Sequence, residues 1–259
     1  MKKAGAIVIA FVLTALALGC YAVARPVKGT AVAEAPAAAE PTAESAAELT
    51  MEAPTPIALK ILMGETQNLA FGGCTWRVLV VQDGRALIIT EGLLPYRPYN
   101  ETYTVITWET CTLRKYLNGE FYNSFTEEER GQIAETIVTN SDNLWYGTEG
   151  GSDTTDRIFL LSLEEVDGYF GDSGDYLNER RMDGNGNRSD YQWYINNAYN
   201  DDRKVAYSDG TPGWWWLRSP GGLGSQAACV DCDGKVDVDG SVCDGANGVR
   251  PALWLKLNP

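Results

Sequence analysis

The sequence contains no histidine. Catalytic triads of the Ser-His-Asp type, Cys-His nucleophiles, histidine metal sites and histidine proton relays all depend on an imidazole. An enzyme with this sequence would have to work with carboxylates, cysteine, lysine or tyrosine alone. We therefore expect that the protein is not an enzyme.

Basic residues are also scarce, with 21 Lys and Arg against 35 Asp and Glu and a net charge of −14 at pH 7. Nucleic acids and anionic lipids both attract positively charged protein surfaces. This charge balance argues against a nucleic-acid partner and against electrostatic adhesion to lipid. We expect contact with a membrane only through an N-terminal anchor.

A long apolar run is missing as well. Lys2 and Lys3 precede the apolar stretch 4–19, which is short for a membrane span but fits an export segment over residues 1–24. Gly19-Cys20 resembles a lipoprotein cleavage site, which would make Cys20 the lipidated residue. Ordinary secretory cleavage after Ala24 and an uncleaved anchor are the alternatives. All three place the rest of the chain outside the cytoplasm.

Two regions follow the export segment. Residues 25–57 are rich in Ala, Pro and Glu and contain no aromatic residue. Such a composition cannot bury enough apolar surface to offset chain entropy, so we expect a disordered linker. Residues 58–259 hold every tryptophan and have the length of one domain.

The few cysteines leave their pairing open. Five follow Cys20, namely Cys74, Cys111, Cys229, Cys232 and Cys243. An odd number outside the cytoplasm leaves at least one thiol free or paired with another molecule. The spacing of Cys229 and Cys232 allows a local disulfide, although both could be unpaired. Redox chemistry is disfavoured because no strand-to-helix turn accompanies the pair.

Local patterns predict an α+β domain with short strands, two or three helices and long loops. Alternating or β-branched runs predict strands over residues 59–63, 69–71, 75–81, 86–90, 157–161, 214–218 and 249–257. Asp83-Gly84 is typical of a hairpin turn. Apolar spacing and capping boxes predict helices over residues 108–117, 126–133 and 162–170, the first ending at Asn118-Gly119. Residues 140–156 and 171–213 are predicted to be loops.

Two bulky segments, residues 214–221 and 248–255, flank a polar insert that is rich in Gly and Asp. This contrast indicates a scaffold that holds a surface for binding. Within a loose six-residue cycle, Val230, Val236 and Val242 are expected to point inward and Asp231, Asp237 and Asp239 outward. The candidate ligand-binding residues are Leu223, Ser225, Gln226, Asp231, Asp237, Asp239, Ser241 and Asp244. Merely solvated turns, or calcium held by the Asp-x-Asp-Gly pairs, are the alternatives.

Another calcium candidate lies at Asp183, Asn185 and Asn187, whose oxygens occur at alternate positions as at the start of an EF-hand loop. The match then fails at Arg188, where the loop needs glycine, and at Tyr194, where it needs glutamate. We therefore favour a solvated loop and expect no cofactor, with calcium as the alternative.

Arg218 and Arg250 lie in apolar, aromatic segments and could bind anions. Arginine in such surroundings more often pairs with a carboxylate or with backbone carbonyls, so we expect a structural role for both. The acidic runs 127–129 and 164–165 fall in first helical turns, where carboxylates cap free N–H groups, and this explains them better than catalysis does.

Several motifs together resemble a bacterial family of surface-protein domains of unassigned function. They are Trp76-Arg77-Val78-Leu79, the segment from Trp108 to Asn118, Phe159-Leu160-Leu161-Ser162, Trp215 to Gly221 and Gly248 to Leu253. That family is similar to C-type-lectin-fold proteins, including the variable proteins of diversity-generating retroelements and, distantly, formylglycine-generating-enzyme-like domains. The resemblance implies a C-type-lectin-like mixed fold whose last strands and loops display the ligand site.

In the retroelement targets, the positions between the two flanking segments are diversified. Carried over to this sequence, they are Leu223, Gly224, Ser225, Gln226, Cys229, Asp231, Cys232, Asp237, Val238, Asp239, Ser241 and Cys243. An ordinary binder of fixed sequence is the alternative. The enzyme-like relatives need a copper-binding cysteine pair in a set context that Cys229 and Cys232 do not match, so no activity carries over.

We therefore expect an exported, surface-tethered, adhesin- or receptor-like domain that binds an extracellular protein or glycan. The alternatives are a calcium-dependent carbohydrate-binding module, a formylglycine-generating-type enzyme and a purely structural wall protein.

Overall fold

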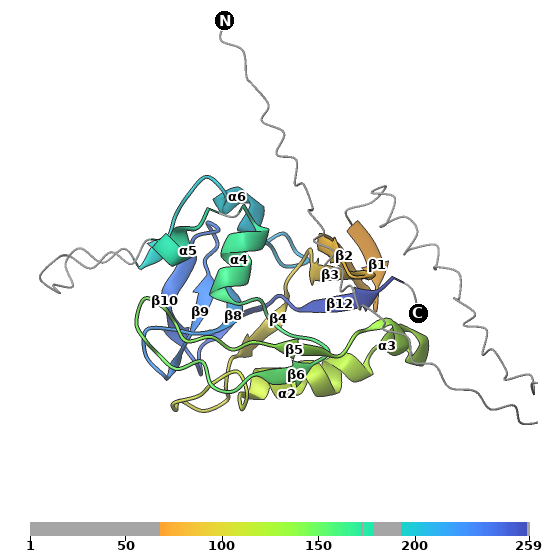
Figure 1. Ribbon diagram of the computed structural model, residues 1–259, viewed down its shortest axis with the longest axis horizontal. Helices are drawn as coiled ribbons and strands as arrows, with labels where there is room; N and C mark the ends of the chain where they lie inside the picture. Colours follow the sequence, from red (N-terminus) through yellow and green to blue (C-terminus); the bar gives the residue numbers. More distant parts are fainter. Residues whose placement is uncertain (1–67, 172, 179–192, 258–259) are drawn as a thin grey trace, which may run out of the picture. The chain divides into compact units, whose positions relative to one another are not determined.

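A four-stranded antiparallel sheet begins the described part of the chain (Figure 1). The computed structural model describes residues 68–171, 173–178 and 193–257. The sheet has the order β1 (Asn68–Phe71), β2 (Cys74–Gln82), β3 (Arg85–Thr90), β12 (Ala252–Lys256). Asp83 and Gly84, with φ of 50° and 69°, form the turn between β2 and β3. The predicted hairpin is confirmed, whereas the predicted strand over 59–63 lies outside the described residues.

The second main sheet carries the two bulky segments and the insert. Its order is β4 (Leu94–Pro98), β11 (Ala246–Val249), β8 (Trp215–Pro220), β9 (Gln226–Val230), β10 (Val236–Val242), β7 (Tyr194–Ile195). Every residue of β8 is buried. The strand predicted over 249–257 is divided at Arg250-Pro251, so that β11 joins this sheet and β12 joins the other. Except for Trp214, which is 36% exposed, the flanking segments therefore form a buried scaffold, as expected.

Short helices and a two-stranded sheet complete the fold. The helices are α2 (Thr112–Tyr116), α3 (Glu127–Gln132), α4 (Leu163–Tyr169), α5 (Asp175–Asn178) and α6 (Asn200–Arg203), and a π-helical turn, η1 (Leu117–Phe121), follows α2. The small sheet pairs β5 (Thr136–Val138) with β6 (Thr154–Asp156). The described residues thus contain five short α-helices rather than two or three. Both predicted capping boxes, Thr126 with Glu129 and Ser162 with Glu165, are confirmed.

The helix predicted over 108–117 and the strand predicted over 157–161 are wrong in detail. Residues 108–110 form a turn, because α2 begins at the Cys111 cap, and the helical path continues past Asn118. The Asn118 amide donates to Ile158 O at 2.8 Å, and its oxygen accepts from Arg157 N at 2.8 Å. This side chain occupies backbone groups of Arg157 and Ile158, and segment 157–161 makes one isolated bridge, between Phe159 and Ala252, rather than a strand.

One apolar core unites these elements, and Trp76, Trp108, Trp215 and Trp216 lie fully inside it. The architecture is a mixed α+β fold, mostly of strands in two main sheets. Among the described residues, no helix combines the length and apolar character needed to cross a bilayer.

Candidate functional site

The insert forms the centre of the six-stranded sheet instead of a loop beside it. Strand β9 lies between β8 and β10, and its pairing with β10 shifts at a bulge between Asp237 and Ser241. Gly240 has a φ of +76°, and a Cβ atom there would lie 2.2 Å from Ala227 O. Only glycine fits this left-handed position and this close approach. The bulge separates the insert into two ends with different surroundings.

At the β9–β10 turn, the Asp231 side chain accepts hydrogen bonds from the backbone. Its Oδ1 accepts hydrogen bonds from Asp233 N at 2.8 Å and Lys235 N at 2.9 Å, and the residue is buried. Arg203 Nε donates to Gly234 O at 2.8 Å in the same turn. The outward orientation predicted for Asp231 is therefore wrong, because the turn N–H groups need an acceptor.

Asp237 is also buried, which corrects its predicted outward orientation. Its Oδ1 accepts from Gly240 N at 2.9 Å and so closes the bulge. Burial raises the pKa of this carboxyl group. Asp239, by contrast, is half-buried.

The three valines that were expected to point inward also differ in their burial. Val230 and Val236 are fully buried, as expected, whereas Val242 is 43% exposed. Val242 lies beyond the bulge, where the regular alternation of the strand has been lost. Its predicted inward orientation is therefore wrong.

Neutralising Asp237 tests this placement. A carboxyl group whose folded-state pKa is raised costs stability as pH rises above the unfolded value of about 3.9. We expect Asp237→Asn to keep the Gly240 hydrogen bond and to stabilise the fold at pH 7, because the amide carries no charge that burial would disfavour. The gain should shrink towards pH 4, as measured by urea unfolding. Stability reduced at pH 7 would show instead that the charged form is preferred.

At the other end of the insert, apolar side chains are exposed together. They are Tyr103 (61% exposed), Val105 (77%), Leu223 (58%) and Val242 (43%), and we call this group the loop-end surface. Leu223 comes from the β8–β9 loop, Val242 from the end of β10, and the other two from the loop after β4. Three segments that are distant in sequence thus contribute to one surface.

Hydrogen bonds join these three segments. Ile106 N donates to Gly224 O at 2.8 Å, Asn100 N to Cys243 O at 2.8 Å, and Cys243 N to Ser225 O at 2.9 Å. The Ser225 hydroxyl donates to the Tyr103 hydroxyl at 3.1 Å. The surface is therefore held by backbone contacts at its base.

The predicted ligand-binding residues are divided between the two ends. Gln226, half-buried, accepts from Leu223 N at 2.9 Å through its side chain and shapes the β8–β9 loop. Ser241 is half-buried and Asp244 exposed, both close in sequence to Val242. Asp231 lies at the opposite end of the hairpin. Asp183, Asn185, Asn187 and Cys20 lie outside the described residues.

Asn143 is a fully buried residue that sequence patterns did not single out. Its amide donates to Pro220 O and Val238 O at 2.9 Å each, and its oxygen accepts from Trp145 N at 3.0 Å. It thus ties the 140–153 segment to β8 and β10, next to the start of the β8–β9 loop that carries Leu223. An asparagine in a polar loop gives no signal of such long-range contacts.

Arg218 has the structural role that was expected. Its Nη2 donates to Glu165 Oε1 at 2.9 Å and to Thr139 O at 3.0 Å, and its Nη1 donates to Leu160 O at 2.8 Å and to Glu165 Oε2. The Nε group also bonds Thr139 O, at 3.2 Å. Every guanidinium nitrogen is therefore engaged.

Arg250 is structural too. Its guanidinium lies 5.0 Å from the ring centre of Trp215 and 5.4 Å from that of Phe170, and its Nε donates to Thr90 O at 3.0 Å. Burial lowers the pKa of this group to about 9. Both arginines hold elements together, and neither offers an open anion site.

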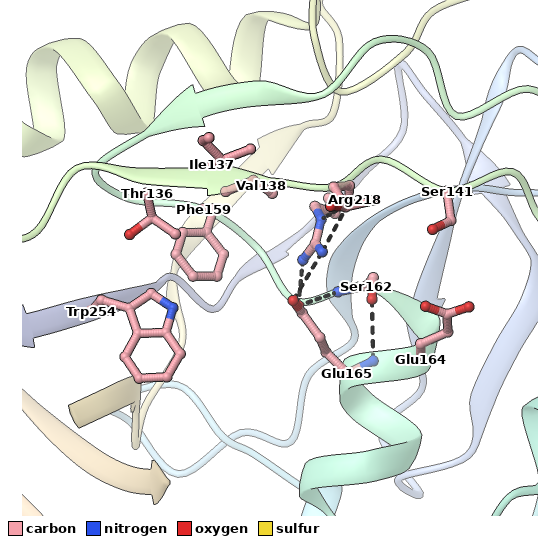
Figure 2. Close-up of a pocket in the computed structure, with 11 residues that line it drawn as sticks. Thr136, Ile137, Val138, Ser141, Phe159, Ser162, Glu164, Glu165, Arg218 and Trp254 are labelled. Carbon is pink, nitrogen blue, oxygen red and sulfur yellow. Dashed lines mark hydrogen bonds and ion pairs between the residues drawn. The ribbon is translucent and has the colours of Figure 1, made fainter. Parts of the chain in front are cut away.

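A small cavity opens beside the Arg218–Glu165 pair, and we call it the α4 cleft (Figure 2). It has a volume of about 180 Å³. Its walls come from β5 and the residues after it, from the start of α4, and from β8 and β12. The lining residues are Thr136, Ile137, Val138, Thr139, Ser141, Phe159, Ser162, Glu164, Glu165, Arg218 and Trp254.

The five cysteines in the described residues are free thiols. Cys229 is buried in β9 and Cys232 is exposed in the turn, so the two point into different surroundings. Burial raises the pKa of the Cys229 thiol, and that of Cys111 to about 12. No group of three or more His, Cys, Asp or Glu side chains in this part of the chain could hold a metal ion.

Cysteine labelling follows from these environments. The thiolate is the reactive form, so exposure favours alkylation, whereas burial and a raised pKa slow it at Cys229. Among the described cysteines, we expect iodoacetamide to modify Cys232 at least about tenfold faster than Cys229 in the native protein. Peptide mass spectrometry measures both sites. Protection of Cys232 that disappears on reduction would reveal a disulfide with Cys229 instead.

Comparison with known proteins gives a family but no function. No curated protein and no solved structure matches the chain. Residues 83–257 match the family described as Domain of unknown function (DUF6273). The match covers more than half of the 259 residues, and it includes the loop-end surface and the α4 cleft. The chain therefore belongs to the DUF6273 domain family.

Proposed function

We propose that the domain is an exported, surface-tethered binding module that recognises an extracellular protein through the loop-end surface. The observation that carries this proposal is that four apolar side chains with large exposed fractions lie on segments that hydrogen bonds join to one another: Tyr103, Val105, Leu223 and Val242. Single exposed apolar side chains are ordinary, but a group of them marks an interaction site. Tyrosine is also enriched in the central regions of protein interfaces.

Pre-organisation supports the same function. Gly224 and Ser225 accept backbone hydrogen bonds from the loop after β4 and from the end of β10. A surface that is already ordered loses little conformational entropy on binding, so more of the contact energy appears as affinity. This arrangement suits recognition by fixed shape.

The resemblance to C-type-lectin-fold proteins rests on sequence motifs only. It agrees with a binding surface built from the last strands and their loops. Of the twelve positions that would be diversified, six are buried: Ser225, Cys229, Asp231, Asp237, Val238 and Cys243. Free variation at buried positions would disturb packing and hydrogen bonds. We therefore favour a binder of fixed sequence.

The test is a binding screen with matched variants. The full chain is screened against purified extracellular proteins and against a glycan array, in calcium and in chelator. For a protein hit, we expect the double change Val105→Ser and Leu223→Ser to weaken binding by about 100-fold, since each buried side chain contributes about 1.5 kcal/mol or more. The control is Leu177→Ser, because Leu177 is 67% exposed on α5, which contributes no residue to this surface.

Three outcomes would contradict the proposal. A protein ligand that binds the double variant as tightly as the wild type would place recognition elsewhere. Glycan binding that requires calcium would favour the carbohydrate-binding alternative. The absence of any ligand in both libraries would favour a structural wall protein.

A further inference from the structure

We propose that the α4 cleft binds one lysine or arginine side chain of a protein partner. The inference rests on the proposed function for the class of partner, but the cleft and the loop-end surface share no residue. The cleft has room for a part of a ligand only. Pockets that enclose whole small molecules measure about 300–1,000 Å³, whereas this one measures about 180 Å³.

Charge decides which side chain fits. The lining residues include two carboxylates, Glu164 and Glu165, and one cation, Arg218. The cleft therefore has one uncompensated negative formal charge, which one basic side chain would neutralise. Arg218 cannot serve an incoming anion, because its nitrogens are engaged with Glu165 and with two backbone carbonyls.

Glu164 is the group that would meet the cation. It is exposed at the second residue of α4, and it makes no ion pair within the described residues. Figure 2 shows it across the helix start from Ser162, on the same side of the cleft as Ser141. A carboxylate there can accept two hydrogen bonds from a guanidinium or one or more from an ammonium group.

The opposite side of the cleft suits the stem of such a side chain. Phe159 and Trp254 lie on that side in Figure 2, and Ile137, which also lines the cleft, is 75% exposed. Lysine and arginine place their methylene groups along apolar surface while the charged end stays in a polar environment. Arg85 lies over the Trp254 ring at 5.0 Å, so one face of the ring is occupied and stacking of a sugar is disfavoured.

The surroundings point to a basic partner as well. The segments 99–110 and 139–153 contain no lysine or arginine, whereas Glu101, Asp142 and Glu149 are exposed in them. Segment 139–153 connects the α4 cleft, through Thr139 and Ser141, to Asn143 next to the start of the β8–β9 loop. A partner that covers both places would therefore meet acidic groups and no repelling cation along this segment.

The chain provides a matched control for Glu164. Glu128 is likewise an exposed glutamate at the second residue of a helix that begins with a capping box, but it lies on α3 and outside the cleft. Glu164→Gln and Glu128→Gln change the net charge and the helix N-terminus equally. Non-specific attraction of cations should fall by the same amount in both, so a difference between them reports the cleft.

The experiment is saturation-transfer NMR on the full-length chain in detergent micelles. The probes are N-acetyl-lysine methylamide, the uncharged norleucine analogue and N-acetylglucosamine. We expect transfer to the lysine methylenes, little to norleucine, and affinity for lysine reduced at least about fivefold by Glu164→Gln but unchanged by Glu128→Gln. Equal thermal unfolding of the two variants verifies their folding.

Several outcomes would overturn the inference. They are no transfer to lysine, equal transfer to norleucine, stronger transfer to the sugar, or equal affinity in both glutamine variants. The double change Val105→Ser and Leu223→Ser should leave lysine binding intact. A partner lost by that variant while lysine shows no binding would preserve the proposed function and reject the basic-side-chain site. Lysine binding without any partner at the loop-end surface would preserve the basic-side-chain site and reject the proposed function.

Discussion

Replacement of Asn143 by alanine is expected to lower the free energy of unfolding by about 2–4 kcal/mol. The change removes an amide that donates to Pro220 O and Val238 O and an oxygen that accepts from Trp145 N. Each buried polar group left without a partner costs about 1–3 kcal/mol. The side chain is fully buried, so water cannot take its place without a rearrangement. Urea denaturation measures the loss.

The loop-end surface should weaken together with the fold. Asn143 holds segment 140–153 against β8 and β10, next to Gly221 and the β8–β9 loop. Hydrogen exchange of the 221–225 amides is expected to accelerate in the variant. Asn123→Ala, at an exposed position, serves as the control and should change stability by less than about 0.5 kcal/mol. A loss of stability as small as that of the control would show that the Asn143 hydrogen bonds do not stabilise the fold.

Arg218→Met is expected to destabilise the domain by about 3–5 kcal/mol, because it leaves the Glu165 carboxylate without its cation and two carbonyls without their donors. Arg218 is only 4% exposed, so solvent does not screen the pair strongly at that side. Thermal and urea unfolding measure the effect.

A surface ion pair provides the comparison. Arg157 lies 2.8 Å from Glu135, with side chains 44% and 56% exposed. Exposed pairs contribute about 0–1 kcal/mol, so Arg157→Met should cost much less than Arg218→Met. Similar losses in the two variants would show that the Arg218 network does not connect α4 to β8 as described.

Local signals predicted local structure well. The capping boxes of α3 and α4 and the Asp83-Gly84 hairpin depend on contacts within a few residues, which a sequence displays directly. The bulky segments also predicted the buried strand β8. The long-range hydrogen bonds of Asn118 and Asn143 were not predicted, because their partners lie 40 and up to 95 residues away along the chain.

The insert shows where a regular pattern fails. Alternation predicted outward aspartates, but Asp231 and Asp237 turn inward to accept hydrogen bonds from the backbone of a turn and a bulge. The Gly240 bulge then shifts the register, so Val242 is exposed. Leu223 and Val242 at one end of the insert are exposed, and the role of the insert in binding stays a prediction. The α4 cleft could not be predicted, since its residues come from four separate segments.

Hydrogen–deuterium exchange on the full chain, with and without a protein ligand identified in the screen, tests the proposed recognition most directly. We expect slower exchange at residues 100–106, 221–225 and 242–245, which form the loop-end surface and its supports. Residues 126–133, which include α3, should exchange at the same rate in both states. Protection confined to α3 or to the β9–β10 turn at 231–235, with no change at the loop-end surface, would contradict the proposal.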